Sequence, residues 1–369
     1  MKLKITHFTS VAVLMFFLIS SSAFAQINTP RGSQKSTVSQ TVGISEVSVT
    51  YSRPSVRGRE IWGKLVPYGM NNLGFGTAKE SPWRAGADEN TIITFSDDAT
   101  VEGKAIKAGT YGLHAEVKQD GSVTIILSNN STSWGSYFYE PSEDALRVDV
   151  ISREIPNKEL LTFDFIEVKP NSTTLALQWE KKEIPITIGF DVTNIVLTDI
   201  RKKMQDQPGF SRQTWEQAAG FALNNGGDLE EALTWINNAI AGQFYSKQTF
   251  NNTQIKAAIL MKQGKRNAAI AAMDEVMPIA TVLEIHQYGR QLIAQGMTDK
   301  AMEIFKFNAD KHKGTWPVHY GLGRGYSAKG DFKNAIKHLE KALKNAPNPQ
   351  SKANVQANLD KLKKGEDIN

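Results

Sequence analysis

The chain of 369 residues contains no cysteine at all. This absence excludes disulfide bonds, thiolate metal sites, a cysteine nucleophile and attachment of a lipid to an N-terminal cysteine. A protein without cysteine is compatible with an oxidising compartment but does not require one. Any chemistry that the chain performs must therefore rest on other side chains.

Long apolar runs are also missing, because no stretch approaches the roughly 20 residues that span a bilayer. The N-terminus nevertheless has the layout of a secretory signal. Lys2 and Lys4 supply a basic start, residues 11–19 an apolar core, and residues 23–25 a small-x-small cleavage site (Ala-Phe-Ala). The sequence predicts a signal peptide over residues 1–25.

Cleavage after Ala25 would leave Gln26 first and place the chain in the periplasm or outside the cell. The alternative is a retained membrane anchor, which the shortness of the apolar core argues against. The mature chain is predicted to have no transmembrane span.

Charge of one sign is not concentrated anywhere in the chain. The formal net charge is +5, from 43 Lys and Arg against 38 Asp and Glu, and the two signs are mixed along the sequence. Without a basic block, no nucleic-acid partner is expected.

Familiar catalytic patterns are absent too. The chain has no His-Glu-x-x-His, no phosphate loop, no dinucleotide-binding glycine pattern and no Gly-x-Ser-x-Gly. His312 and His319 are seven residues apart with Pro317 between them, which makes a poor metal pair. We therefore predict no catalytic residue, no metal site and no cofactor.

Residues from about 35 to 190 follow a period of two rather than the helical period of 3.6. Asp120-Gly121 lies between two such runs and indicates a hairpin. Eight or so short strands at this spacing predict an antiparallel β-sandwich or barrel. The strand-like runs are residues 38–51, 91–95, 122–127, 146–150, 161–165, 174–179 and 184–188.

An unusual segment interrupts these strands. It reads Tyr-Ser-Arg-Pro-Ser-Val-Arg-Gly-Arg-Glu-Ile-Trp-Gly-Lys-Leu-Val-Pro-Tyr-Gly over residues 51–69, and Pro-Trp-Arg-Ala-Gly-Ala-Asp-Glu over residues 82–89. With Ala-Gly-Thr-Tyr at 108–111 and Ser-Trp-Gly at 133–135, it resembles the bacterial domain-of-unknown-function family DUF2911 over residues 34–190. The resemblance implies a secreted bacterial protein, often from Bacteroidota, and implies no established activity or catalytic residues.

The same segment concentrates arginines beside aromatic residues. Guanidinium groups bind carboxylates and phosphates and stack on aromatic rings, so one hypothesis is a pocket for an anionic or sugar-like ligand. The alternative is a structural loop in which the arginines pair with Glu60, Asp88 and Glu89. The candidate ligand-binding residues are Arg53, Arg57, Arg59, Trp62, Tyr68, Trp83, Arg84 and Glu89.

In the C-terminal half, a glycine is followed four times by an alanine five residues later. The glycines are 37, 32 and 34 residues apart, which resembles the period of tetratricopeptide repeats. We predict an α-solenoid of such helix pairs over residues 194–369, with a leading helix at 194–205 and a capping helix at 350–364. The pairs are Gly227 and Ala232, Gly264 and Ala269, Gly296 and Ala301, and Gly330 and Ala335.

The repeat register predicts which side chains share a surface. His286 and Tyr320 are 34 residues apart, as are Arg290 and Arg324, and each arginine lies four residues after its partner. Neither arginine has a local acidic neighbour, so both suit a carboxylate in a peptide groove. The alternative is that they are solvated or paired between repeats.

Together these features predict a two-domain protein, a β-domain followed by a helical repeat domain. The favoured interpretation is an exported, non-enzymatic scaffold of the bacterial cell envelope that binds a protein or peptide through the repeat groove. The alternative is a glycan-directed, hydrolase-like envelope enzyme that uses the β-domain, with the repeats as a recruiting arm. A close carboxylate pair or a histidine-carboxylate pair in a deep β-domain pocket would favour the enzyme.

Overall fold

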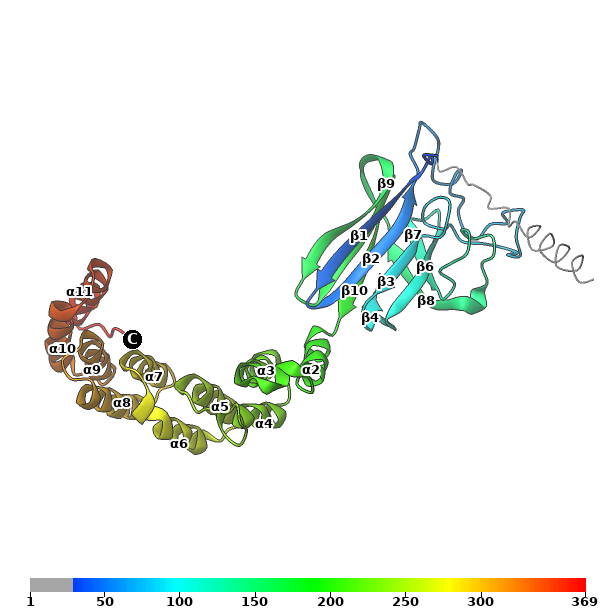
Figure 1. Cartoon of the computed structure of the whole chain (residues 1–369). Helices are drawn as coiled ribbons and strands as arrows, with labels where there is room; N and C mark the ends of the chain where they lie inside the picture. The colour runs from blue at the N-terminus through cyan, green and yellow to red at the C-terminus, as the bar shows by residue number, and fades with distance from the viewer. Residues whose placement is uncertain (1–28) are drawn as a thin grey trace, which may run out of the picture. The chain divides into compact units, whose positions relative to one another are not determined.

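The computed structural model describes residues 29–369, which form two compact units that divide between Val192 and Thr193 (Figure 1). The predicted signal peptide lies outside the described residues and stays a prediction. Within the described range, no helix has the length and apolar character to cross a bilayer.

The first unit consists of two antiparallel sheets, and it is not a closed barrel. The predicted antiparallel β-domain is thus confirmed in its two-sheet form. One sheet contains, in spatial order, β1 (Gln34–Val42), β2 (Ser45–Arg53), β3 (Ile92–Phe95), β6 (Gly109–Val117), β7 (Ser122–Ser128) and β8 (Asp144–Ile151). The other contains β5 (Lys104–Ile106), β4 (Ala99–Val101), β10 (Ser172–Phe190) and β9 (Arg153–Lys169).

The alternation of apolar and polar residues along the strands determines which side chains lie in the core between the sheets. In β2, Val47, Val49 and Tyr51 are all buried, as a period of two requires. The Tyr51 ring meets Phe163 of β9 edge-on, with 4.8 Å between centroids, and the Tyr51 hydroxyl accepts a hydrogen bond from the Phe163 backbone N–H at 3.0 Å. This contact joins the two sheets.

The three strand-like runs after residue 160 form two long strands instead of three short ones. β9 pairs over its whole length with Ser172–Glu183 of β10, and the register shifts three times, around Thr174, Gln178 and Glu180. The end of β10 pairs with β4 instead. Glu180 takes a left-handed backbone angle (φ 53°) at such a bulge. The bulges interrupt the alternation, which is why the sequence predicts separate strands there.

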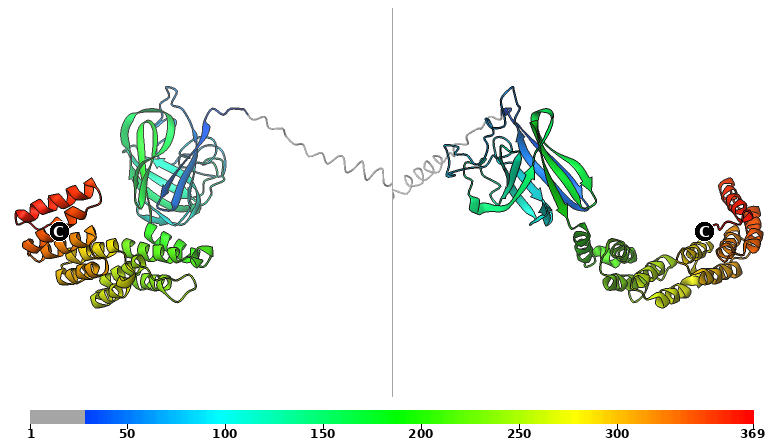
Figure 2. Two further views of the ribbon diagram at one scale, coloured as in Figure 1. Left: turned by 60° about the vertical axis from the view of Figure 1, so that its left-hand side comes forward. Right: turned by 180° about the vertical axis from the view of Figure 1, so that it is seen from behind.

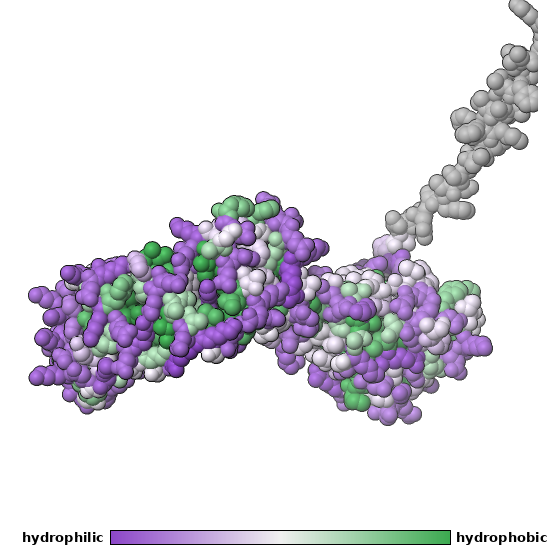
Figure 3. Space-filling view, turned by 90° about the horizontal axis from the view of Figure 1, so that it is seen from below, coloured by the Kyte–Doolittle hydropathy of each residue, from purple (hydrophilic) through white to green (hydrophobic). Residues whose placement is uncertain are grey.

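The second unit is a curved row of helix pairs, as predicted. The first helix of each pair lies on the inner side of the curve (Figures 1 and 2). The four pairs are α3 (Arg212–Asn225) with α4 (Leu229–Ile240), α5 (Phe250–Lys262) with α6 (Arg266–Val276), α7 (Val282–Ala294) with α8 (Thr298–Lys311), and α9 (Trp316–Ala328) with α10 (Phe332–Asn345). Before them comes α2 (Val192–Lys203), and after them α11 (Pro349–Lys363). The face seen in Figure 3 is mostly hydrophilic, with scattered apolar patches, and the buried side chains of both units are mainly apolar.

The repeat glycines close the turn between the two helices of a pair. Gly264, Gly296 and Gly330 all have φ between 74° and 78°, a left-handed conformation that glycine adopts without strain. In the first pair the residue with this conformation is Gly226 (φ 79°) rather than Gly227, so the anchor lies one residue earlier than the sequence pattern indicates.

A second set of small residues lets neighbouring helices approach. One phase of the repeat is occupied by Gly220, Ala257, Gly289 and Gly323. A Cβ on Gly289 would lie 2.4 Å from Cε1 of Phe305, a ring that is itself 1% exposed. At Gly323 the corresponding distance to Leu339 Cδ1 is 2.0 Å, whereas Gly220 has nothing within 4 Å. At this phase, the third and fourth pairs therefore require glycine, whereas the first pair has room for a methyl group.

Phe305 also determines the surroundings of His286. A Cβ on Gly321 would lie 2.6 Å from the Phe305 ring and 3.1 Å from Nδ1 of His286. His286 is buried, and its Nδ1 donates to the Pro317 carbonyl at 3.1 Å. Burial, helped by the charges of Arg324 and Arg290, lowers the pKa of His286 to about 4.

We predict that Gly289→Ala lowers the free energy of unfolding of the repeat unit by about 1 to 3 kcal/mol, because the new methyl group overpacks against Phe305. Gly220→Ala is the matched control at the same repeat phase. It should raise that free energy by up to about 1 kcal/mol through helix propensity alone. Chemical denaturation followed by circular dichroism measures both, and equal effects of the two changes would contradict the packing account.

A second prediction follows from His286. Its folded pKa is about 4 and its unfolded value about 6.5, so the unfolded state binds the proton first as the pH falls. The contribution of neutral His286 to the stability of the folded state is complete above about pH 6.5 and is lost as the pH falls towards 4. In His286→Phe this loss should shrink by up to about 3 kcal/mol, since one pKa unit corresponds to about 1.36 kcal/mol. An unchanged pH dependence in denaturation curves would contradict the burial of a neutral His286.

Candidate functional site

The β-domain contains a cavity of about 510 Å³, here called the β-domain cavity. It brings together four of the predicted ligand-binding residues, Arg57, Arg59, Trp83 and Arg84. The cavity is lined by Gly32, Ser33, Pro54, Ser55, Arg57, Arg59, Leu65, Val66, Trp83, Arg84, Gly86, Ala87, Asp88, Trp134, Tyr137 and Trp179.

Strained backbone surrounds this cavity. Within residues 29–369, five residues other than glycine have a positive φ. Three of them belong to the two loops that form the cavity wall: Arg57 (50°), Ala85 (51°) and Asp88 (59°). Such conformations cost free energy and tend to cluster at sites where the geometry has a function.

Arg84 is held rigidly in the wall. Its Nη1 donates to the Asp88 carbonyl oxygen at 2.7 Å, and its guanidinium lies over the Tyr137 ring at 5.1 Å from the centroid. A Cβ on Gly135 would come within 2.5 Å of the Arg84 Nη1. Gly135, one of the residues in the Ser-Trp-Gly run, therefore makes room for the guanidinium.

Arg57 and Arg59 differ in what their side chains contact. Arg59 donates Nε to the Val56 carbonyl at 3.0 Å and Nη2 to the Ser55 carbonyl, so it ties its own loop. The backbone N–H of Arg57 is fixed by Oε1 of Glu159 at 2.9 Å. The Arg57 guanidinium is exposed, and among the described residues it has no hydrogen-bond or ion-pair partner.

Three tryptophans form the aromatic side of the cavity. Trp83 and Trp179 are stacked, with centroids 6.0 Å apart, and both line the cavity. Trp62 packs edge-on against both, 5.8 and 6.2 Å away, and lies behind them. Trp179 is 1% exposed, yet its indole Nε1–H has no acceptor in the described part of the chain.

Three of the predicted ligand-binding residues lie outside the cavity besides Trp62. Arg53 donates to the Leu161 carbonyl at 2.9 Å and to Thr162 Oγ1 at 2.7 Å, so it joins β2 to β9. Glu89 pairs with Arg31 at 2.5 Å, and Tyr68 packs on Gly63. The ion pairs expected from the structural alternative are not formed among these described residues, since Arg84 binds the backbone of Asp88 and Glu89 has another partner.

Behind the cavity, His114 is almost fully buried, with its Nδ1 2.9 Å from Ser136 Oγ. Burial and then the charge of Arg84 lower the pKa of His114 to about 4, so it is neutral at ordinary pH. The cavity lining contains one carboxylate, Asp88, and no histidine. The arrangement that would favour the enzyme alternative is therefore not found in this lining.

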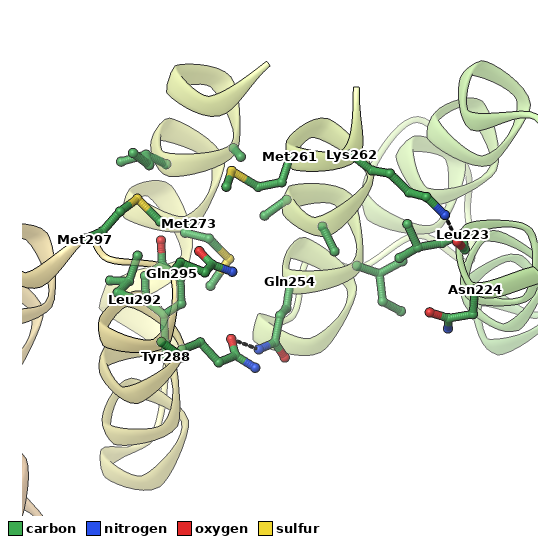
Figure 4. Close-up of a pocket in the computed structure, with 17 residues that line it drawn as sticks. Leu223, Asn224, Gln254, Met261, Lys262, Met273, Tyr288, Leu292, Gln295 and Met297 are labelled. Atoms are coloured by element: carbon green, nitrogen blue, oxygen red, sulfur yellow. Dashed lines mark hydrogen bonds between the residues drawn. The ribbon is translucent and has the colours of Figure 1, made fainter. Parts of the chain in front are cut away.

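The repeat unit has a larger cavity of about 890 Å³ lined by residues of α3, α5, α6 and α7, here called the methionine-glutamine cavity (Figure 4). Met261, Met273 and Met297 supply mobile apolar surface, and the amides of Gln254 and Gln291 meet at 2.8 Å. The lining is completed by Leu223, Asn224, Ile255, Ala257, Ala258, Lys262, Ala269, Ile270, Tyr288, Leu292, Ala294 and Gln295. The one charged group in this lining, Lys262, donates to the Leu223 carbonyl at 2.7 Å.

A neighbouring cavity of about 390 Å³, here called the arginine cavity, contains both predicted groove arginines. Its lining is Gln287, Arg290, Gln291, Ile293, Ala294, Arg324 and Asn369. Gln291 and Ala294 line both cavities, so the two are adjacent, and together they are here called the repeat groove. Arg290 makes no hydrogen bond or ion pair within residues 29–369.

The other two predicted groove residues support Arg324 from below. Tyr320 stacks on His286 with 5.7 Å between ring centroids, and Arg324 lies 4.9 Å over the Tyr320 ring. His286 is thus covered by Tyr320, and it contributes to the groove through packing rather than as a contact surface.

Residues 366–369 of the chain itself lie on α9. Arg324 Nη1 donates to the Ile368 carbonyl at 2.8 Å, and the Asn369 side chain donates to the Arg324 carbonyl at 3.1 Å. Ser327 Oγ donates to Asp367 at 2.5 Å and accepts from the Ile368 N–H at 3.2 Å. The Ile368 side chain is 7% exposed and joins the apolar cluster of α10 and α11. Sequence reasoning missed Ser327 and this segment, because the contacts span about 40 residues and follow no repeat phase.

No group of three or more metal-binding side chains occurs in the part of the chain that the structure covers. The repeat groove and the β-domain cavity are therefore the two sites on which binding can be argued.

Solved tetratricopeptide proteins are similar to parts of the chain. The C-terminal part of a TPR repeat-containing protein from Cytophaga hutchinsonii is 17% identical, covering 47% of this chain and 67% of that one, with a TM-score of 0.35. YrrB, described as a TPR protein with an unusual peptide-binding site, is 16% identical, covering 45% and 84%, with a TM-score of 0.30. A thermophilic TPR protein from Thermus thermophilus is 16% identical, covering 46% and 90%, with a TM-score of 0.30.

No curated protein shows significant similarity to the chain. Residues 33–188 match the family described as protein of unknown function (DUF2911), and residues 316–349, which comprise α9 and α10, match the tetratricopeptide repeat. The chain therefore contains a region that matches the DUF2911 family, followed by helix pairs of which the last matches the tetratricopeptide repeat.

Proposed function

We propose that the protein is an exported, non-enzymatic scaffold of the bacterial cell envelope that binds an extended peptide segment along the repeat groove. The observation that carries this proposal is the seat of residues 366–369 on α9. There the repeat surface already holds a segment without regular secondary structure by main-chain and side-chain hydrogen bonds together, as peptide-binding surfaces do.

The chemistry of the methionine-glutamine cavity supports the same function. Glutamine amides can both donate to and accept from a peptide backbone. Methionine side chains adapt to apolar side chains of different shape. With the single charged group of this lining already bound to a carbonyl, the cavity suits an uncharged stretch of peptide.

The arginine cavity adds a preference for negative charge at one end. Arg290 is unpartnered within the described residues, and Arg324 binds a carbonyl of the 366–369 segment. In the seated segment, Asp367 is held by Ser327 and Asn369 rather than by an arginine. Burial raises its pKa, but these side-chain bonds and those from the Ile368 and Asn369 backbone together keep the pKa below its usual value. The partner segment we propose is therefore apolar with an acidic residue at one end.

We predict that a chain shortened to end at Gly365 binds a labelled peptide Lys-Gly-Glu-Asp-Ile-Asn, the sequence of residues 364–369. The full chain should bind it at least about tenfold more weakly, because its tethered segment competes at an effective concentration in the millimolar range. In the shortened chain, Arg290→Ala combined with Arg324→Ala should lose most of the binding, and salt should weaken it. Fluorescence anisotropy measures these affinities.

Arg201→Ala is a matched control, because Arg201 lies on α2 and pairs with Glu231 away from the groove. In the full chain, Ile368→Gly empties the apolar seat without shortening the protein, and it should also admit the peptide. Shortened and Ile368→Gly chains that keep their helical circular dichroism but do not bind the peptide would contradict the proposal.

Export is a separate part of the proposal, and it rests on the signal sequence. Mass spectrometry of the protein from its native host should find a mature N-terminus at Gln26, in an envelope or extracellular fraction. Intact protein that begins at Met1 in the cytoplasm would show that this part is wrong.

A further inference from the structure

We propose that the β-domain cavity binds an acidic sugar, a carbohydrate ring that bears a carboxylate. This site is independent of the repeat groove. The proposal rests on the charge of the cavity, on the strained placement of Arg57, and on the aromatic walls with a carboxylate that makes no ion pair in the described structure.

The charge of the lining favours an anion. Three guanidinium groups, those of Arg57, Arg59 and Arg84, face one carboxylate, that of Asp88. Guanidinium groups bind carboxylates with two parallel hydrogen bonds, and this geometry is stronger and more specific than that of a lysine. Arg59 and Arg84 are already fixed by carbonyl oxygens of their own loops, so they supply positive potential without moving.

Arg57 is the residue placed to bind the anion directly. Its left-handed backbone would suit glycine or asparagine better than arginine, so the arginine side chain is kept there at a cost in stability. The Glu159 carboxylate pins its backbone, while its guanidinium is exposed and unpartnered among the described residues. An exposed side chain without a hydrogen-bond or ion-pair partner, on a backbone conformation that disfavours it, suits a binding role better than a structural one.

The aromatic walls favour a ring over a simple ion. Trp83 and Tyr137 are half-buried in the lining, and Trp134 is 52% exposed beside them. Flat aromatic side chains can stack on the apolar face of a sugar ring. The volume of about 510 Å³ is within the usual range of small-molecule sites, about 300 to 1,000 Å³.

A hydroxyl group of a sugar would also find a hydrogen-bond acceptor in the lining. The Asp88 carboxylate, which makes no ion pair in the described structure, can accept from a hydroxyl. One ligand with a carboxylate, a ring face and hydroxyls meets all three requirements.

The test uses the full mature chain and isothermal titration with glucuronate, a short oligouronate, glucose and inorganic phosphate. Glucuronate or its oligomer should bind at least about tenfold more tightly than glucose, since charge-assisted bonds contribute about 1.5 kcal/mol or more. Arg57→Gly should weaken this binding at least about tenfold. The same change should leave the melting temperature unchanged or raise it, because glycine relieves the backbone strain.

Arg53→Ala is the matched control from the same segment. It should lower the melting temperature, because Arg53 joins β2 to β9, and it should leave uronate binding intact. Phosphate that binds as tightly as glucuronate would overturn the proposal in favour of a simple anion site. Absence of uronate binding, or equal binding by wild type and Arg57→Gly, would overturn it outright.

Discussion

The repeat domain depends on the place of one ring. Phe305 of α8 fills the space in which Gly289, Gly321 and Gly325 would otherwise carry side chains, and it also contacts His286. Because its ring is fully buried, α7 and α9 can approach only where they present hydrogen atoms to it. That spacing brings Arg290 and Arg324 to one cavity and lets Tyr320 cover His286. The groove therefore depends on small residues at fixed repeat phases, and this packing determines where its polar side chains lie.

The β-domain builds its cavity by a different means. There the geometry comes from backbone conformations that cost free energy, at Arg57, Ala85 and Asp88, and from glycines that make room, such as Gly135 beside Arg84. The two sheets and their shared core supply the stability against which this strain is held. One chain thus combines a cavity formed by strained loops with a groove formed by relaxed, repetitive packing.

The sequence predicts most of the fold because both units are periodic. The alternation of apolar residues specifies β2 and β3, and the glycine phase specifies four helix pairs. The prediction is less accurate where the periodicity is interrupted. β10 continues as one strand through the bulges near Gln178 and Glu180, although the sequence predicts two strands there. In the first helix pair, Gly226 rather than Gly227 adopts the left-handed conformation.

The sites were predictable only where local rules apply. The repeat phase predicts that Arg290 and Arg324 share one surface. It does not predict how deeply a side chain is buried, so only the structure shows that His286 is buried under Tyr320. The sequence places Arg57, Arg59 and Arg84 in the same candidate site as Arg53. It does not show that Arg53 has a different role, which is to bind carbonyl and hydroxyl oxygens of β9. The position of residues 366–369 depends on contacts with α9, which lies about 40 residues earlier in the sequence, and no sequence pattern predicts these contacts.

Hydrogen-deuterium exchange on the shortened chain tests the central claim, that the repeat groove is a peptide-binding surface, most directly. On addition of the Lys-Gly-Glu-Asp-Ile-Asn peptide, exchange should slow in α7 and α9, which carry Arg290 and Arg324, while the β-domain stays unchanged. Unchanged exchange in both helices, or protection confined to the β-domain, would contradict the account.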